Sequence, residues 1–222
     1  MRIRKAKSIS NESKLLGLSI ERKTNLVALA AFVLSLGAIL AQLPALLRGP
    51  QLKLLPVRQV IFDIRKKDDT PPYIVLVARL NYINTGATGY DDIVLDERAT
   101  ILVGGRKYEQ TWLNFLKPPS DTQVKMKPLR DAAPFKVAAG DTVDHHTEFF
   151  PRSSQKGQNY LIWSDFSSAL TRGDIVSVEI QFKSAKGKQS RTTCRLGASS
   201  DILHFLNEKE QTAQECIQTD DE

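Results

Sequence analysis

A long uncharged segment near the start of the chain constrains its fold more than any other feature. Residues 24–47 contain no charged side chain, and a short basic tail precedes them. At a rise of about 1.5 Å per residue, about 20 apolar residues cross a hydrocarbon core of about 30 Å. A helix packed on a soluble core would also show a polar face, which this segment lacks. The sequence therefore predicts a transmembrane helix over residues 25–47.

Most of the net charge of +6 lies ahead of this segment. Residues 1–24 contain seven Lys or Arg and two Glu, whereas the rest of the chain contains 24 basic and 23 acidic residues. Basic residues flanking a span are retained in the cytoplasm. We therefore expect a cytoplasmic tail over 1–24 and a periplasmic domain after the span, at a bacterial inner membrane. The near-neutral domain argues against a nucleic-acid partner, which would require clustered positive charge.

A cleaved signal peptide is the alternative interpretation of the same segment. Signal peptides have an apolar stretch of about 7–15 residues and a small-x-small cleavage site. The segment here is longer, and the candidate site before Gln42 has Ile39 three positions back. These features favour an uncleaved signal-anchor that crosses the membrane once.

The remainder of the chain is rich in strand-like segments. Gly104 and Gly105 join two apolar runs, which is the pattern of a β-hairpin. Apolar and polar residues alternate from Val176 to Lys183, as on a strand with one buried face. The predicted strands are 60–64, 74–83, 93–103, 106–115, 143–150, 176–183 and 191–196.

Two segments of the C-terminal half have helical patterns. Ser164 is a candidate cap for a short helix to Leu170, and Ser199 and Ser200 for a helix to about Ile217. Many short strands with glycine-rich turns are typical of an antiparallel sandwich or barrel. We expect a mainly β protein with an immunoglobulin-like sandwich over 48–198. A C-terminal helix and acidic tail are expected over 199–222.

The two cysteines of the chain, Cys194 and Cys216, both follow the predicted span. The expected strand and helix turn both sulfurs toward the core, and an oxidising compartment permits a bond between them. Two buried free thiols are the alternative. The export prediction favours the disulfide.

A divalent metal site is one hypothesis for the segment 143–149. Asp144, His146 and Glu148 alternate along a predicted strand and therefore share a face, and their side chains are of metal-ligating types. In the alternative interpretation this is merely the solvent-facing side of the strand. The residues between them, including His145, would then point inward.

Other motifs give no catalytic assignment. Asp91, Asp92, Asp96 and Glu97 lack the spacing of a calcium loop, and a solvated turn is the simpler interpretation. The triplet that begins at Asn84 has an amide where an aspartic protease needs a carboxylate. The sequence contains no nucleophile elbow, phosphate loop or Cys-x-x-Cys motif. We therefore predict no enzymatic activity and no cofactor.

Two features suggest contact surfaces. Gly37, Ala41 and Ala45 recur at every fourth position of the predicted span, a spacing that lets two helices approach closely. Phe149 and Phe150 are adjacent, so on a strand one ring faces away from the core. That outward ring is a candidate contact residue.

The function favoured by these patterns is a membrane-anchored, non-enzymatic protein-interaction module outside the cytoplasm, within a bacterial envelope complex. The alternative is a ligand- or metal-binding periplasmic sensor or carrier domain that uses Asp144, His146 and Glu148. The sequence identifies neither the protein partner nor a small-molecule ligand.

Overall fold

The computed structural model describes residues 12–15, 18–21, 25–49, 51–67, 70–117, 126–151, 153–154, 157–158, 160–197 and 199–217. The chain divides into two compact units, Met1–Arg48 and Gly49–Glu222, which we describe separately. The second unit is called the β-domain below. The rest of the predicted basic tail and the acidic residues at 219–222 lie outside the described residues.

The first unit consists mainly of a helix. Strands β1 (Glu12–Leu15) and β2 (Leu18–Glu21) form a short hairpin, and helix α1 spans Asn25–Arg48. Large apolar side chains of α1 are exposed: Leu29, Phe32, Val33, Leu34, Leu36, Ile39, Leu40 and Leu43. Within the described residues, no helix combines the length and the hydropathy of a membrane span.

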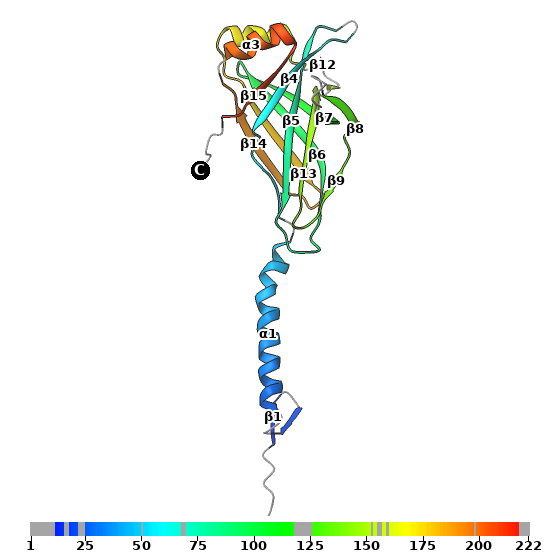
Figure 1. Ribbon diagram of the computed structural model, residues 1–222, viewed down its shortest axis with the longest axis vertical. Helices are drawn as coiled ribbons and strands as arrows, with labels where there is room; N and C mark the ends of the chain where they lie inside the picture. Colours follow the sequence, from blue (N-terminus) through cyan, green and yellow to red (C-terminus); the bar gives the residue numbers. More distant parts are fainter. Residues whose placement is uncertain are drawn as a thin grey trace, which may run out of the picture. The chain divides into compact units, whose positions relative to one another are not determined.

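The β-domain contains one main antiparallel sheet (Figure 1). Its hydrogen-bonded path runs β14-β13-β6-β7-β10-β5-β4-β15, with β3 paired to β5, β8 to β7 and β9 to β6. The strands are β3 (Leu52–Leu54), β4 (Gln59–Arg65), β5 (Tyr73–Asn84), β6 (Asp92–Val103), β7 (Arg106–Lys117), β8 (Lys127–Asp131), β9 (Phe135–Val137), β10 (Thr142–Pro151), β13 (Ser177–Ser184), β14 (Gln189–Arg195) and β15 (Gln211–Glu215). The short pair β11 (Ser153–Ser154) and β12 (Gly157–Gln158) lies apart from it.

The prediction of a mainly β, antiparallel fold is confirmed, but the immunoglobulin-like sandwich is wrong. A sandwich needs two sheets, whereas here one hydrogen-bonded path of eight strands curls strongly into a half-barrel. The terminal strands of the path approach each other where Ile217 donates a backbone hydrogen bond to Arg195. Short strands in series fit either architecture, because strand spacing does not reveal where a sheet is interrupted.

The longest strands of the sheet are β5, β6 and β7, with 12 residues each. The β6–β7 hairpin turns through Gly104 and Gly105, whose φ angles of 56° and 74° suit glycine and are typical of a tight hairpin turn. On β5, Leu76, Leu80 and Tyr82 are buried on the inner face. Register shifts in the β10–β7, β13–β6 and β7–β8 pairings mark bulges, which bend strands and help the sheet to curl.

The C-terminal helix is shorter than predicted. Helix α3 covers Ser199–Lys209, and Glu210 then takes a positive φ of 57° that ends the helix. The residues up to Glu215 form β15, which pairs with β4. The charged Lys209 breaks the apolar helical stripe, and pairing with an open edge of the sheet then outweighs helix continuation. Helix α2 (Trp163–Thr171) begins after Ile162, so Ser164 is inside the helix rather than its cap.

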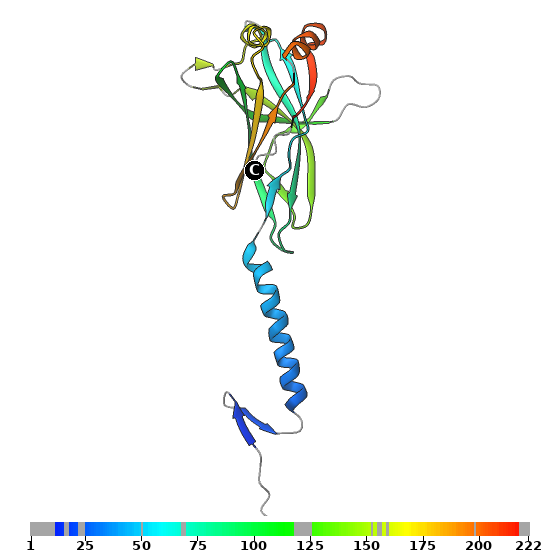
Figure 2. The ribbon, with the colours of Figure 1, turned by 90° about the vertical axis from the view of Figure 1, so that its left-hand side faces the viewer.

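Helices α2 and α3 lie side by side at one end of the β-domain, called the helix end below (Figure 1 and Figure 2). Phe166 of α2 packs on Phe62 of β4, with ring centroids 5.4 Å apart. Ile202 and Leu206 of α3 are buried in the same core. The helices therefore seal the core that the curled sheet encloses.

Asn84 fastens the opposite end of the β-domain. Its buried side chain accepts hydrogen bonds from the backbone N–H groups of Gln51 and Gly86, and donates to the carbonyls of Tyr90 and Val137. The residue before β3, the loop after β5 and strand β9 are thereby joined at one amide. Asn84 therefore has a structural role, and it also lacks the carboxylate that an aspartic protease needs.

Asn84→Ala is expected to destabilise the β-domain by about 2–3 kcal/mol, because it leaves buried backbone groups unsatisfied. Chemical denaturation of both proteins measures this difference. Asn81→Ala, on the partly exposed outer face of β5, is the matched control and is expected to cost less than about 0.5 kcal/mol. Equal losses for the two variants would contradict the assigned role.

Candidate functional site

A groove lined by aromatic rings lies near the helix end of the β-domain. Its volume is about 430 Å³, and the residues that line it are Lys67, Thr70, Pro71, Tyr73, Phe150, Tyr160 and Ile162. We call it the aromatic groove. A concave, largely apolar surface with a few polar groups is the usual form of a binding site.

Strand alternation places the rings of this groove. On β10, Phe149 is fully buried in the core, so Phe150 points outward and is only half-buried. The ring of Tyr73 lies 5.4 Å from Phe150 at 75°, and 5.5 Å from Tyr160 at 37°. The expected outward ring is therefore Phe150, and it belongs to a cluster of three aromatic residues.

Charged and hydroxyl-bearing side chains surround the aromatic groove. Arg65 lies beside Tyr73 and pairs with Asp63 at 2.7 Å and with Glu148 at 3.1 Å. Burial raises the pKa of the Tyr73 hydroxyl, although the Arg65 charge opposes this effect. Lys67 is exposed at the groove, and the two residues that follow it in the chain, Asp68 and Asp69, lie outside the described residues.

The predicted metal-binding residues share the outer face of β10, where Asp144 and Glu148 contact other side chains of the β-domain. Asp144 pairs with Arg79 of β5. Glu148 accepts hydrogen bonds from Arg65 and from Asn114, the latter at 2.7 Å. Across the described residues, no group of three or more His, Cys, Asp or Glu side chains is placed to hold a metal ion. The face is thus organised by arginine–carboxylate pairs.

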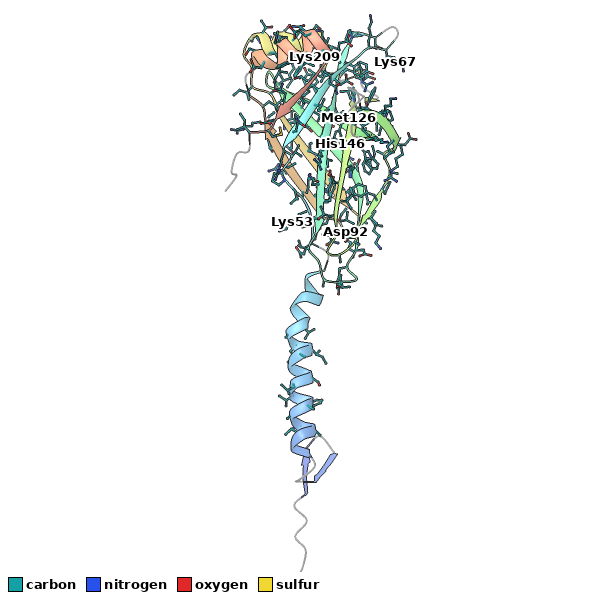
Figure 3. The ribbon with its side chains drawn as sticks, viewed as in Figure 1. Lys53, Lys67, Asp92, Met126, His146 and Lys209 are labelled. Atoms are coloured by element: carbon teal, nitrogen blue, oxygen red, sulfur yellow. A yellow bond between two sulfur atoms is a disulfide. The ribbon has the colours of Figure 1, made fainter. Side chains whose placement is uncertain are left out.

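His146 lies on this face, halfway along the β-domain (Figure 3). Its titration makes the stability of the β-domain depend on pH. Its partial burial lowers the pKa of the imidazole below 6.5, and the Arg79 charge adds to this effect. The unfolded chain therefore takes up a proton more readily than the folded chain. We expect the free energy of unfolding to decrease as the pH falls below about 6.5.

His146→Gln should weaken this decrease, because it removes the group that titrates differently in the two states. Urea unfolding at a series of pH values between 8 and 5 measures the slope. Asn81→Ala, on the same outer face, is the control and should leave the slope unchanged, because it removes no titratable group. An identical slope in the wild type and His146→Gln would rule out this histidine as its origin.

Sequence reasoning missed a buried polar cluster centred on Glu97. The Glu97 carboxylate has no exposed surface and accepts hydrogen bonds from the hydroxyls of Tyr82 and Thr147, both at 2.8 Å. The Nε2 atom of His145 lies 2.9 Å from the same carboxylate. Burial, followed by the nearby Glu97 charge, raises the pKa of Tyr82 well above 10.0. Three strands are joined by this one side chain.

Aromatic rings enclose the Glu97 cluster. The His145 ring lies 4.6 Å from Phe115 and 4.8 Å from Phe135, which precedes Lys136 on β9. The solvated turn expected around Glu97 is therefore wrong, because Glu97 lies on β6 and faces the core. Asp92 is also buried, and its Oδ2 atom has no hydrogen-bond partner among the described residues.

The predicted disulfide between Cys194 and Cys216 is confirmed, with Cα atoms 4.9 Å apart. It joins β14 to the residue that follows β15, so it links the two terminal strands of the sheet path. The predicted partner of Cys194 lay on a helix, whereas Cys216 actually follows a strand. The pairing was nevertheless correct because both interpretations turn the sulfur toward the core.

The small-residue row of α1 stays a prediction. Gly37 and Ala41 are exposed on the helix, and the side chain of Ala45 lies outside the described side chains. No atom approaches within 4 Å of the position that a Cβ would take on Gly37. Gly37 and Ala41 are therefore open to solvent in the described part of the chain.

No model of a known protein family matches this chain, and no curated protein sequence matches it significantly.

Proposed function

We propose that this chain is a non-enzymatic protein-interaction module of a bacterial envelope complex, and that the aromatic groove is its contact site. The observation that carries the proposal is the placement of the three rings. Tyr73, Phe150 and Tyr160 lie around one concavity outside the closed core. Tyrosine and other aromatic residues are enriched at protein interfaces, where their large area is buried at low entropic cost.

The proposed location is the inner membrane, with α1 as a single span and the β-domain in the periplasm. Its support is the uncharged segment 24–47, together with the exposed Leu, Ile, Val and Phe side chains of α1. Such an apolar surface needs lipid or a protein partner. The basic tail favours a cytoplasmic N-terminus. The disulfide is in keeping with an oxidising compartment.

The buried chemistry supports a binding role over a catalytic one. Glu97 and His145 are the types of side chain that act as acid and base, but the Glu97 carboxylate is inaccessible. Its hydrogen bonds link β5, β6 and β10, and they are directed into the core. We assign this cluster to stability.

Reporter fusions test the proposed topology. A reporter that is active only in the periplasm, fused after residue 222 of the full chain, should be active. The same reporter fused to a chain that lacks residues 24–47 should be inactive. Activity of a cytoplasm-specific reporter at the same position would overturn the orientation and the envelope assignment.

Site-specific cross-linking tests the contact site. A photoreactive residue at position 160 in the full chain should capture an envelope protein in intact cells, and Tyr73→Ala should reduce that capture. A photoreactive residue at exposed Arg191 on β14 is the control and should not capture the same protein. Equal capture at both positions, or none at position 160, would argue against the groove as an interface.

A further inference from the structure

We propose that the outer edge of β14 binds the chain's own C-terminal residues, 218–222, as an added antiparallel strand. A strand edge with unpaired backbone groups is a template on which another extended segment can pair. Residues 218–222 directly follow Ile217 and lie outside the described residues. This edge and the aromatic groove are formed by different strands, so the occupant of the edge is independent of the proposed contact site.

Strand β14 has a strand partner on one side and little on the other. All seven of its residues pair with β13. Among the described residues, the backbone pairing at its other edge is confined to the Arg195–Ile217 bridge, on the side of the β-domain that also carries β15 (Figure 1). Strand β3 contacts β14, but its backbone pairs with β5. The rest of this edge is therefore available to a further strand.

The Arg195–Ile217 bridge sets the register of the added strand. Ile217 donates its backbone N–H to the Arg195 carbonyl at 2.8 Å, and the bridge is antiparallel. Backbone groups two residues apart on a strand point to the same edge, and antiparallel partners are counted in opposite directions. Thr219 therefore falls opposite Thr193, and the next facing pair lies two residues further along each strand.

The side chains of the outer face match in this register. Asp221 falls opposite Arg191, which is exposed, and directly opposed residues place their side chains on the same face of a sheet. The preceding facing pair, at positions 219 and 193, consists of two threonines. Opposite charges and threonine pairs both stabilise antiparallel strands at such positions.

The inner face of β14 offers hydroxyl groups to the remaining carboxylates. Ser190 and Thr192 are half-buried on this face. The same register places Asp220 opposite Thr192, and Glu222 opposite Ser190. Hydroxyl groups donate to carboxylates, and the negative charge strengthens such hydrogen bonds. Each acidic residue of the segment therefore meets a cation or a donor on β14.

The charges of the last two sheet strands favour an acidic occupant. Strands β13 and β14 contain three basic residues, Lys183, Arg191 and Arg195, and one acidic residue, Glu179. The turn that joins the two strands adds two more lysines. The three carboxylates of residues 220–222 would offset this excess of positive charge, whereas a basic strand would be repelled.

Tethering favours this segment over a strand from a second copy. The Cys194–Cys216 disulfide and the Ile217 bridge hold the residues just before 218 at the edge of β14. A tethered segment pairs at a high effective concentration, whereas a second copy must also lose its translational freedom.

Amide hydrogen exchange of the full chain in detergent micelles, resolved by residue with NMR, tests the inference. Thr219→Pro removes a backbone N–H that faces β14, whereas in the matched control Gln218→Pro the lost N–H faces away. We expect the Arg191 and Thr193 amides to exchange at least about tenfold faster in Thr219→Pro than in the wild type. Gln218→Pro should leave their exchange unchanged. The Thr192 amide, which points to β13, should be unaffected in both variants.

A charge exchange gives a second test. Arg191→Glu and Asp221→Arg should each speed exchange of the Thr193 amide by about two- to fivefold, the expected effect of losing one cross-strand pair. The double variant Arg191→Glu, Asp221→Arg restores opposite charges and should return the rate toward that of the wild type.

Three results would overturn the inference. The first is equal exchange of the Arg191 and Thr193 amides in the wild type and Thr219→Pro. The second is a double charge variant that exchanges no more slowly than either single variant. The third is protection that disappears on dilution, which would assign the edge to a second copy of the chain. General unfolding of a variant would also expose the Thr192 amide, so that amide separates unfolding from loss of the added strand.

Discussion

Replacing Glu97 with leucine is expected to lower the free energy of unfolding by about 3–5 kcal/mol, as does breaking other buried polar pairs. Leucine fills a similar volume, so the expected loss is mainly electrostatic. The hydroxyls of Tyr82 and Thr147 and the Nε2 atom of His145 would lose their shared acceptor. Each buried group left unsatisfied costs about 1–3 kcal/mol. Urea denaturation followed by tryptophan fluorescence measures the loss.

Three companion variants identify the cause of that loss. Glu97→Gln keeps an acceptor for Tyr82 and should cost markedly less than Glu97→Leu. Tyr82→Phe should be less harmful in the Glu97→Leu background than alone, because it removes a donor that is already unsatisfied. Glu109→Ala, at an exposed position of β7, should change stability by less than about 0.5 kcal/mol. Additive losses for the Glu97 and Tyr82 changes would contradict a shared network.

The sequence predicted strands well where apolar and polar residues alternate without interruption. The expected strand from Val176 to Lys183 corresponds to β13, and the Gly104–Gly105 turn joins β6 to β7 as predicted. The closure of the sheet was harder to predict from the sequence, because it depends on which strands pair, and paired strands can lie far apart in the sequence. The β15 segment shows this limit. Its residues fit a weak helical stripe, but in the structure they pair with the edge strand β4.

The candidate site was predictable only in part. The adjacency of Phe149 and Phe150 implied one outward ring, since alternate residues of a strand face opposite sides. Tyr73 and Tyr160 gave no such signal, because they are brought together by the contact between β5 and the residues before α2. Glu97 was misjudged for a related reason. A carboxylate among other acidic residues resembles a solvated turn until its partners on β5 and β10 are known.

Removing the disulfide is expected to lower the free energy of unfolding by about 3 kcal/mol. The bond closes a loop with a sequence separation of 22, and the chain-entropy model gives about this value for such a loop. The Cys194→Ala, Cys216→Ala double variant, unfolded in urea, measures the loss. The local effect should be largest at β15, since the described contacts between β14 and the residues after β15 include only one backbone bridge, Arg195–Ile217.

Hydrogen exchange should therefore detect faster opening of β15 than of β5 in the double variant, because β5 is paired on both sides along the sheet path. A reducing agent should destabilise the wild-type chain to the level of the double variant and should leave the double variant itself unchanged. If full reduction of the wild type left both its stability and the exchange of β15 unaltered, the bond would be irrelevant to closure of the sheet. The few hydrogen bonds around Cys216, including that from its N–H to the Arg58 carbonyl, would then be sufficient to hold the terminal strands together.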